Sequence, residues 1–285
     1  MSRREAAPAA VRWTAYIAVA IVFAIACAFL SNWQFTRNAS RAEQLALVEA
    51  NYDATPVPLG DLLPEGGELT ASDEWHPVIL TGRYLPDDQL LVRNRPHGGT
   101  AAFEVLVPFR LDDGRVLMVD RGWVPPGVDQ PDPDGVPAPP EGDATVVVRI
   151  RPGEPLPASG RSAPAGQMPT VNLPLAADLV GADASGLETG AYGVLVSEDP
   201  APAERPQALE SPSEDPGPHL SYAIQWILFA IMGFIFIGYV IRTERRHRRE
   251  DAEDAGTPGA ASAPTRPRRD RDAAEEDALA DRAAR

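Results

Sequence analysis

The residues best suited to chemistry gather at the start of an apolar segment late in the chain. His219, Tyr222, Gln225 and Trp226 precede a run that stays uncharged until Arg242. On a helix, residues 219, 222 and 226 share one face, because their spacing is i, i+3 and i+7. A neutral imidazole backed by aromatic rings could coordinate or cradle an iron porphyrin. The same residue types also form ordinary interfacial anchors, since Tyr and Trp are enriched at membrane boundaries.

Two apolar segments are long enough to cross a bilayer and must position these residues. We predict transmembrane helices at residues 13–35 and 219–241. A basic start followed by an apolar run is also typical of a signal peptide, and residues 24–27 resemble a lipoprotein cleavage box. The apolar run continues beyond that box, however, so we interpret it as a span with Cys27 as a buried thiol.

The arginines predict how the chain is oriented in the membrane. Residues 1–12 carry three arginines and residues 242–249 carry five, whereas residues 36–218 are strongly acidic. The positive-inside rule then predicts a multi-pass plasma-membrane protein with both termini in the cytoplasm and an extracytoplasmic domain at residues 36–218. Arg37 and Arg41 lie outside against this trend, so we expect them to have partners there.

The domain between the spans has the pattern of an α+β fold that is mainly antiparallel β. Residues 37–51 favour a helix continuing out of the first span. Asp112-Asp113-Gly114 predicts a tight hairpin, because Asp-Gly suits turns that need positive φ. The other expected elements are strands at 78–84, 90–92, 103–111, 116–119, 144–150 and 192–196, a short helix at 173–180, and loops at 125–143 and 152–170.

Two further segments lack apolar periodicity. Residues 198–218 contain recurring prolines, which is typical of an extended connector that returns to the membrane. Residues 242–285 are rich in Asp, Glu, Arg, Ala and Pro, and we predict a disordered cytoplasmic tail.

Composition and missing motifs narrow the classes of function. The net charge of -15 argues against nucleic-acid binding, which needs a basic surface. The single cysteine excludes an internal disulfide and a cysteine-based metal site. No phosphate loop, nucleophile elbow or histidine pair at metal spacing occurs. His97, beside Arg93 and Arg95, is more typical of a turn residue, although these side chains could help to hold an anionic group.

One compact polar motif lies inside the domain, at the end of the hairpin's second strand. Asp120-Arg121-Gly122-Trp123 would allow a guanidinium to stack on an indole or to reach a carboxylate, with the backbone passing close by. The same residues are equally consistent with a strand end whose Trp fills the core. The sequence leaves both interpretations open.

Three ordered segments resemble signatures of the surfeit locus protein 1 family, which are membrane factors for the biogenesis of cytochrome c oxidase. They are Ser31–Arg37 with Arg41, then Asp113-Gly114 with Val119–Pro125, and finally His219–Trp226. The resemblance covers about residues 13–245. Ser31 replaces a family glycine, Arg41 a lysine and Pro218 an asparagine; we expect Ser31 to loosen close helix packing and Pro218 to remove an amide hydrogen bond.

This resemblance implies a function and a site. Bacterial members would bind haem a and help to install it in oxidase subunit I, with His219 in the position of the iron ligand. Arg37 would lie near a haem propionate, because the first helix should end at the same level. The remaining cofactor-binding candidates are Trp33, Gln34, Tyr222 and Trp226, and the motif residues of the domain are Arg121, Gly122 and Trp123.

The implied partners are oxidase subunit I, other oxidase assembly factors and the lipid bilayer, and no enzymatic activity is expected. The alternative is a membrane scaffold that stabilises oxidase subunits or assembly factors without haem. In that case the motifs at the membrane would serve only for packing.

Overall fold

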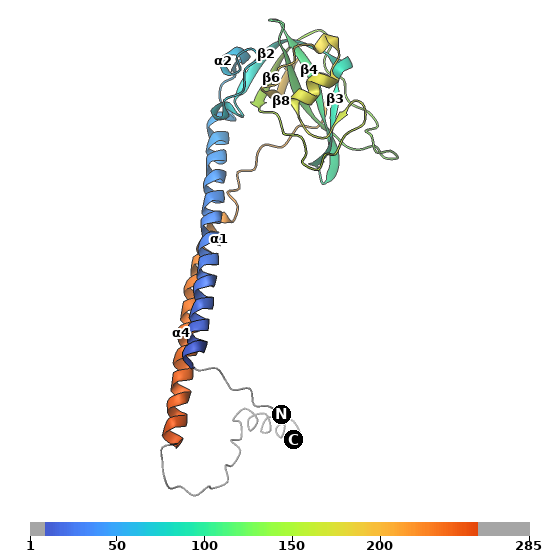
Figure 1. Cartoon of the computed structure of the whole chain (residues 1–285). Coiled ribbons are helices and arrows are strands. Elements are labelled where there is room, and N and C mark those ends of the chain that lie inside the picture. The colour runs from blue at the N-terminus through green and yellow to red at the C-terminus, as the bar shows by residue number, and fades with distance from the viewer. Residues whose placement is uncertain (1–8, 256–285) are drawn as a thin grey trace, which may run out of the picture. The chain divides into compact units, whose positions relative to one another are not determined.

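The computed structural model describes residues 9–255, and Figure 1 shows the arrangement of their elements. These residues form two compact units. Residues 9–34 and 221–255 form a helical hairpin, and residues 35–220 form a β-rich domain. Two of the N-terminal arginines, Arg3 and Arg4, and residues 256–285 of the predicted tail lie outside the described residues.

Two long helices supply the hairpin. They are α1 (Ala9–Asn51) and α4 (His219–Ala255), and both are long and apolar enough to cross a membrane. The expected helix at residues 37–51 is confirmed, because α1 runs without a break from the first span to Asn51. Since no glycine or proline occurs within α1 after its start, nothing in this segment interrupts the helix.

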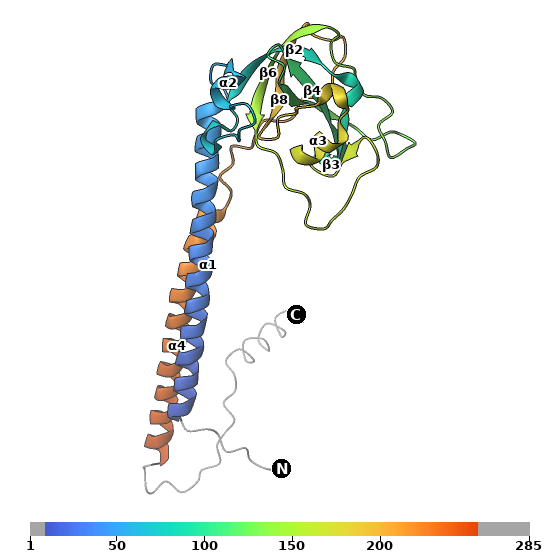
Figure 2. The same ribbon diagram turned by 45° about the horizontal axis from the view of Figure 1, so that its top comes forward.

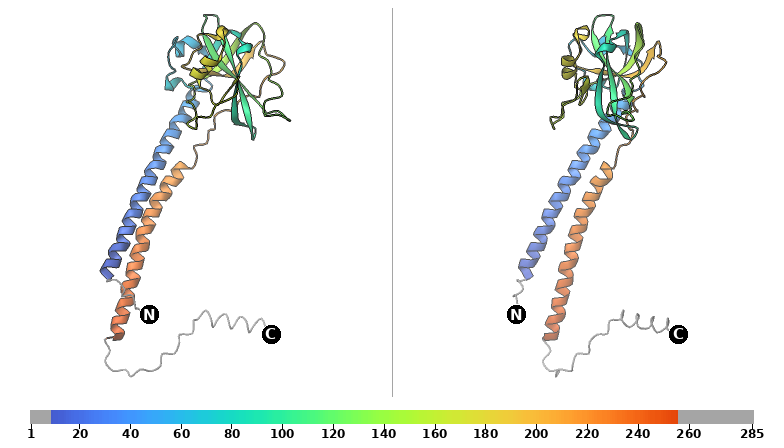
Figure 3. Two further views of the ribbon diagram at one scale, coloured as in Figure 1. Left: turned by 45° about the vertical axis from the view of Figure 1, so that its right-hand side comes forward. Right: turned by 90° about the vertical axis from the view of Figure 1, so that its right-hand side faces the viewer.

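Small side chains allow the two helices to pack closely as an antiparallel pair, and Figure 3 shows them side by side in both views. A Cβ on Gly233 of α4 would lie 3.1 Å from a ring carbon of Phe23 on α1. Ala20 and Cys27 are buried on α1, which confirms Cys27 as a buried free thiol. Close contact at small residues is how helices associate where lipid gives no hydrophobic drive.

The helix α4 extends beyond the predicted end of the span at residue 241. Residues 242–255 are helical, which corrects the prediction that the tail is disordered from its first residue. Two i, i+4 ion pairs stabilise this polar part of the helix, Arg246 with Glu250 at 3.0 Å and Arg248 with Glu244 at 3.3 Å. Ion pairs along the helix therefore stabilise α4 beyond the end of its apolar part.

The β-rich domain is a closed barrel with strands attached at its edges (Figure 2). The strands β2, β6, β8, β5 and β4 pair in that order, and a further pairing of β2 with β4 closes the ring. The strands are β1 (Val57–Pro58), β2 (Pro77–Tyr84), β3 (Leu90–His97), β4 (Thr100–Leu111), β5 (Val116–Val124), β6 (Asp143–Arg151), β7 (Gln167–Met168) and β8 (Tyr192–Asp199).

Most strand pairs are antiparallel, as the sequence predicts, but three are parallel. They are β1 with β2, β3 with β7, and β5 with β8. The predicted hairpin between β4 and β5 is confirmed, with Gly114 at φ 91° and the Asp113 carboxylate accepting from Arg115 N at 3.0 Å. The segment 152–170 is not wholly a loop, because β7 forms where it passes the edge of β3.

Alternation along the strands divides the buried side chains between two cores. One core fills the barrel and includes Val105 and Phe109 of β4 and Val119 of β5. The other includes Leu106 of β4 and Met118 of β5, with residues of the helix α3 (Leu173–Leu179). Successive residues of a strand face opposite sides, so β4 and β5 are buried on both faces.

Four short helical segments complete the domain. They are α2 (Leu59–Leu62), η1 (Ala71–Asp73), η2 (Pro86–Asp88) and η3 (Ala182–Ala184). The Asn172 side chain accepts from Leu175 N at 3.0 Å and so caps α3, the helix expected at residues 173–180. After β8 no further strand or helix occurs among the described residues until α4, which confirms an extended connector, although β8 extends to Asp199.

Candidate functional site

We call the end of the hairpin that contains Ser31 and Ala223 its outer end, after the predicted orientation, and a contact between these two residues fixes it. The Ser31 hydroxyl donates to the Ala223 carbonyl oxygen at 2.9 Å, and both residues are buried. The expectation that Ser31 loosens the helix packing is therefore wrong. A hydroxyl is small enough for the interface and forms a bond there that glycine cannot.

This contact brings together two of the predicted site segments. Trp33 and Gln34 follow Ser31 on α1, while Tyr222 and Trp226 flank Ala223 on α4. Trp33 and Tyr222 are each 47% exposed, so part of each side chain is accessible. Trp226 is half-buried and meets Phe229 edge-on, with ring centroids 5.8 Å apart. Aromatic side chains thus lie at the predicted ends of both spans.

The remaining two candidates belong to the other compact unit. Arg37 is exposed on α1, one turn beyond Trp33, and His219 is the half-buried first residue of α4. That Arg37 and His219 lie close to each other and to the aromatic residues remains a prediction.

Arg41 fixes the chain that leads into His219. Its Nη2 donates to the Ser213 carbonyl at 2.6 Å, and its Nε donates to the Asp215 carbonyl at 3.1 Å. Gly217 then turns with φ 72°, its N–H donating to the Asp215 carboxylate at 2.8 Å. The expectation that Arg41 has a partner outside the membrane is confirmed. The sequence did not indicate that the partner would be the backbone just before His219.

The side-chain types among the predicted site residues fit a haem group. A neutral imidazole is an iron ligand, an arginine matches a propionate, and partly exposed Trp and Tyr rings suit the apolar face of a porphyrin. The half-buried imidazole of His219 remains partly accessible. The same set also fits an interfacial anchor, because nothing in the donor chemistry requires iron.

The motif in the barrel has a structural role. Arg121 is almost fully buried, and its Nη2 lies 3.1 Å from Glu198 Oε1. Its Nη1 also donates to the Pro137 carbonyl at 2.9 Å. The Tyr84 hydroxyl donates to the other Glu198 oxygen at 3.0 Å. Burial, followed by the nearby Glu198 charge, raises the pKa of Tyr84, which keeps this donor protonated. The two interpretations of the motif are thus resolved in favour of structure.

Gly122 and Trp123 of the motif hold the connector against β5. A Cβ on Gly122, whose φ is 118°, would lie 2.2 Å from the Gln207 carbonyl oxygen. Trp123 and Gln207 exchange two backbone hydrogen bonds of 2.8 Å each. Only glycine permits this approach at this φ.

His97 belongs to a partly buried network of polar and charged side chains. Its Nε2 lies 2.9 Å from Glu104 Oε1, and its ring stacks on Trp123 with centroids 5.6 Å apart. Arg95 lies 2.8 Å from Glu104 Oε2 and 2.9 Å from Glu154 Oε1. These carboxylates already pair with Arg95 and His97, which argues against the suggestion that these two side chains hold an external anion; for Arg93 the suggestion stays a prediction.

Asp120 lies beside the same network. Burial raises its pKa well above the usual range, and the nearby Glu104 carboxylate raises it further. The Gly122 N–H donates to Asp120 Oδ1 at 3.0 Å and partly opposes this shift. The sequence analysis did not predict that Asp120 and Glu104 lie close together. The available signal was an acidic residue in each of two strands that are largely apolar.

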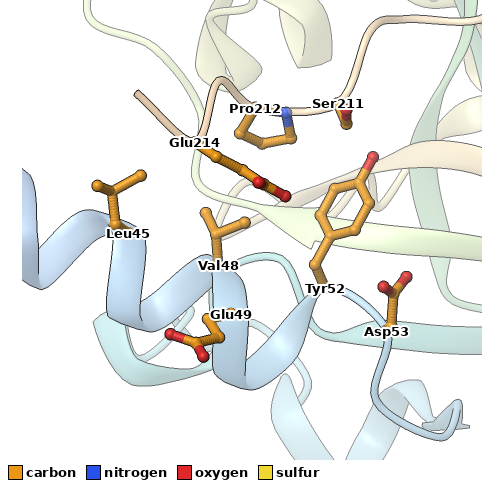
Figure 4. Close-up of a pocket in the computed structure, with 8 residues that line it drawn as sticks. All are labelled: Leu45, Val48, Glu49, Tyr52, Asp53, Ser211, Pro212 and Glu214. Atoms are coloured by element: carbon orange, nitrogen blue, oxygen red, sulfur yellow. The ribbon is translucent and has the colours of Figure 1, made fainter. Parts of the chain in front are cut away.

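A groove of about 600 Å³ separates the outer end of α1 from the connector (Figure 4). Its apolar part is formed by residues such as Leu45 and Val48, and its lining also carries the carboxylates of Glu49, Asp53 and Glu214. Carboxylates would repel haem propionates, so this groove is poorly suited to the predicted ligand. In the described part of the chain, no group of three or more His, Cys, Asp or Glu side chains could hold a metal ion.

Comparison with known proteins identifies the family. Residues 21–231 match the SURF1 family. The chain belongs to the SURF1 family. SURF1-like proteins of Mycobacterium bovis and Mycobacterium tuberculosis are 36% identical to it over 238 residues, which cover 82% of this chain and 85% of theirs. The resemblance inferred from the three motifs is thereby confirmed.

More distant relatives match shorter parts of this SURF1 family member. The cytochrome oxidase assembly protein SHY1 of Saccharomyces cerevisiae is 28% identical over 99 residues, which are 34% of this chain and 24% of the yeast protein. A SURF1-like protein of Rickettsia felis is 28% identical over 109 residues, or 38% of this chain and 45% of its own length. Two candidate spans together with family membership indicate a membrane protein.

Proposed function

We propose that this protein is a membrane factor for the assembly of cytochrome c oxidase, and that it binds haem a and helps to deliver it to oxidase subunit I. Family membership carries the assembly role, because a yeast relative is itself named a cytochrome oxidase assembly protein. The haem step rests on the residues at the outer end of the hairpin and on the resemblance of their motifs.

His219 is the proposed iron ligand. It begins α4, is partly accessible, and precedes an apolar helix that would keep a hydrophobic haem tail out of water. The proposed neighbours supply an aromatic surface from Trp33, Tyr222 and Trp226. Arg37 would bind a propionate by a charge-assisted hydrogen bond, and Gln34 would add a polar contact. Haem a is cargo here, passed to another protein.

The chain's own contribution would be binding and orientation, without turnover. We propose that the protein is not an enzyme. The support comes from the barrel, where Arg121 was the main candidate for a reactive side chain. Arg121 is almost fully buried and forms an ion pair with Glu198. A group held in this way cannot reach a substrate.

We also propose an orientation. The protein would lie in the plasma membrane with both termini in the cytoplasm and the barrel outside the cytoplasm. The arginines at residues 242–249 support it, because basic flanks stay on the cytoplasmic side. A reporter that is active only outside the cytoplasm should work when it is fused near Pro131 and fail when it is fused after Arg249. The reverse pattern would overturn the orientation.

The haem step is tested by purifying the full chain in detergent from cells that make haem a and recording its absorption spectrum. The parent should carry haem a, and His219→Ala should lose it at equal protein level. His247→Ala is a matched control, since His247 is an exposed histidine on the same helix and pairs with Glu250. Equal haem in the parent and in His219→Ala would contradict the assignment.

A membrane scaffold without haem is the other candidate function. The acidic groove between α1 and the connector favours it, because its carboxylates and apolar residues could receive a partner protein. Parent protein that lacks haem but still restores oxidase in a deletion strain would select the scaffold.

A further inference from the structure

Arginines repeat along one face of α4 just past its apolar part. Arg242, Arg245, Arg246 and Arg249 follow one another at i, i+3, i+4 and i+7, so they share a face. All four side chains are exposed. At 1.5 Å per residue this stripe covers about 10 Å along the helix, which is comparable to one headgroup layer of a bilayer.

A glycine opens the helix surface at the membrane end of this stripe. A Cβ on Gly238 would meet no atom within 4 Å. Gly238 and Ile241 join the four arginines around a notch of about 380 Å³. The notch is therefore apolar toward the span and cationic away from it, which complements the first acyl carbons and the anionic phosphate of a phospholipid.

Trp13 marks the depth at which this notch lies. Its Nε1 donates to the Glu244 carboxylate at 2.9 Å, and Arg245 lies over its ring at 4.6 Å from the centroid. Tryptophan prefers the headgroup level of a bilayer. The arginine stripe begins at Arg242, about one turn nearer the span than the Glu244 and Arg245 that contact Trp13.

The arginines differ in whether a carboxylate already neutralises them. Arg248 pairs with Glu244 and Arg246 pairs with Glu250. Within the described residues, Arg242 and Arg249 form no ion pair, so their charge is available to an external anion. Arg248 lies on another side of the helix and does not line the notch.

We propose that this notch is a binding site for one anionic phospholipid. The lipid phosphate lies between Arg242, Arg245 and Arg249, and the start of an acyl chain covers Gly238. Charge attracts the headgroup, and the missing side chain at residue 238 provides a place for the chain. This inference is independent of haem binding and of the leaflet in which the helix end lies.

Native mass spectrometry of the full chain in mild detergent tests the site, with phosphatidylglycerol and phosphatidylcholine as probes. The parent should retain one phosphatidylglycerol and no phosphatidylcholine. The double variant Arg242→Gln with Arg249→Gln should bind phosphatidylglycerol about tenfold more weakly, because each basic residue near an anionic surface contributes to the attraction. Arg248→Gln is the matched control and should bind as the parent does.

A second variant separates a shaped site from charge alone. Gly238→Leu keeps every arginine but fills the notch, and it should weaken phosphatidylglycerol binding several-fold, whereas Gly238→Ala should have a smaller effect. Both side chains suit a helix interior better than glycine does. Circular dichroism and the reporter fused near Pro131 check the fold and orientation of each variant.

Three results would overturn the proposal. One is equal retention of phosphatidylcholine, which would remove headgroup selectivity. Another is a combined result in which Arg248→Gln weakens phosphatidylglycerol binding as much as the double variant does, and Gly238→Leu leaves it unchanged. That result would indicate general electrostatic attraction. The third is displacement of the lipid by millimolar inorganic phosphate, which would indicate a simple anion site.

Discussion

The barrel and the outer end of the hairpin use polar residues in opposite ways. In the barrel, the side chains of Arg121 and Glu198 are nearly inaccessible to solvent, and they form an ion pair with each other. Among the predicted site residues, Trp33 and Tyr222 of the hairpin are about half exposed, and His219 is half-buried. A motif that looks chemical in sequence can therefore be structural, whereas a residue set that looks like an anchor retains the accessibility that ligand binding requires.

The comparison predicts the largest effect at Arg121. Arg121→Met should lower the free energy of unfolding by about 3–5 kcal/mol, because it leaves the Glu198 charge buried without its partner. Thermal unfolding of the purified chain measures this loss. Adding Glu198→Leu to the same protein should recover much of the stability, since it removes the orphaned charge. A single variant as stable as the parent would show that the pair does not hold the barrel.

His219→Ala should have the reverse signature. We expect loss of bound haem a with an unchanged melting temperature, because alanine suits a helix and the apolar part of α4 remains. Haem content per protein and thermal unfolding of one preparation give both values. A large loss of stability would mean that His219, like Arg121, has a structural role, and the comparison would fail.

Arg37→Ala should weaken haem binding without abolishing it. A charge-assisted hydrogen bond to a propionate contributes about 1–3 kcal/mol, so haem content should fall at limiting haem and recover at excess. Arg83→Ala is a suitable control, because Arg83 is exposed on β2 in the barrel. If both variants lower haem content equally, Arg37 has no specific contact with the ligand.

Asp120→Asn should have the smallest effect, and only on pH dependence. The folded pKa of Asp120 is raised, so its protonated form favours folding below the unfolded pKa, and this contribution is lost as pH rises through the folded pKa. Glu104, Arg95 and Arg151 face the same carboxyl group and set the size of the effect.

The Asn variant keeps an acceptor for the Gly122 N–H and should unfold with a flatter pH profile than the parent. Unfolding temperatures measured from pH 4 to 8 test this expectation. Parallel profiles for the two proteins would show that Asp120 does not titrate differently in the folded and unfolded states.

Local patterns predicted the elements but not how distant strands meet. The Asp113-Gly114 turn and the apolar helices are encoded within a few residues, and both are confirmed. The closure of β2 on β4 and the parallel pairing of β5 with β8 join segments far apart in the chain. No periodicity within a strand specifies such a partner.

The roles of the polar residues could not be predicted from the sequence for the same reason. Arg121 was noted, but its partner Glu198 comes from a strand that the sequence analysis ended near residue 196. A buried ion pair leaves no mark in either strand except the two charges, which do not reveal that they pair. At the hairpin, the motifs predicted which residues lie near the ends of the two spans, and the contact of Ser31 with Ala223 emerged only from the structure.

The bonds from Arg41 to Ser213 and Asp215 have a consequence for chain length. Arg41 and Ser213 are 172 positions apart, yet one side chain joins them just before α4 begins. The barrel is therefore an insertion whose two ends are tied together at its base. Residues added between 200 and 212 should be absorbed on the barrel side of this tie, leaving His219 at its place on the helix.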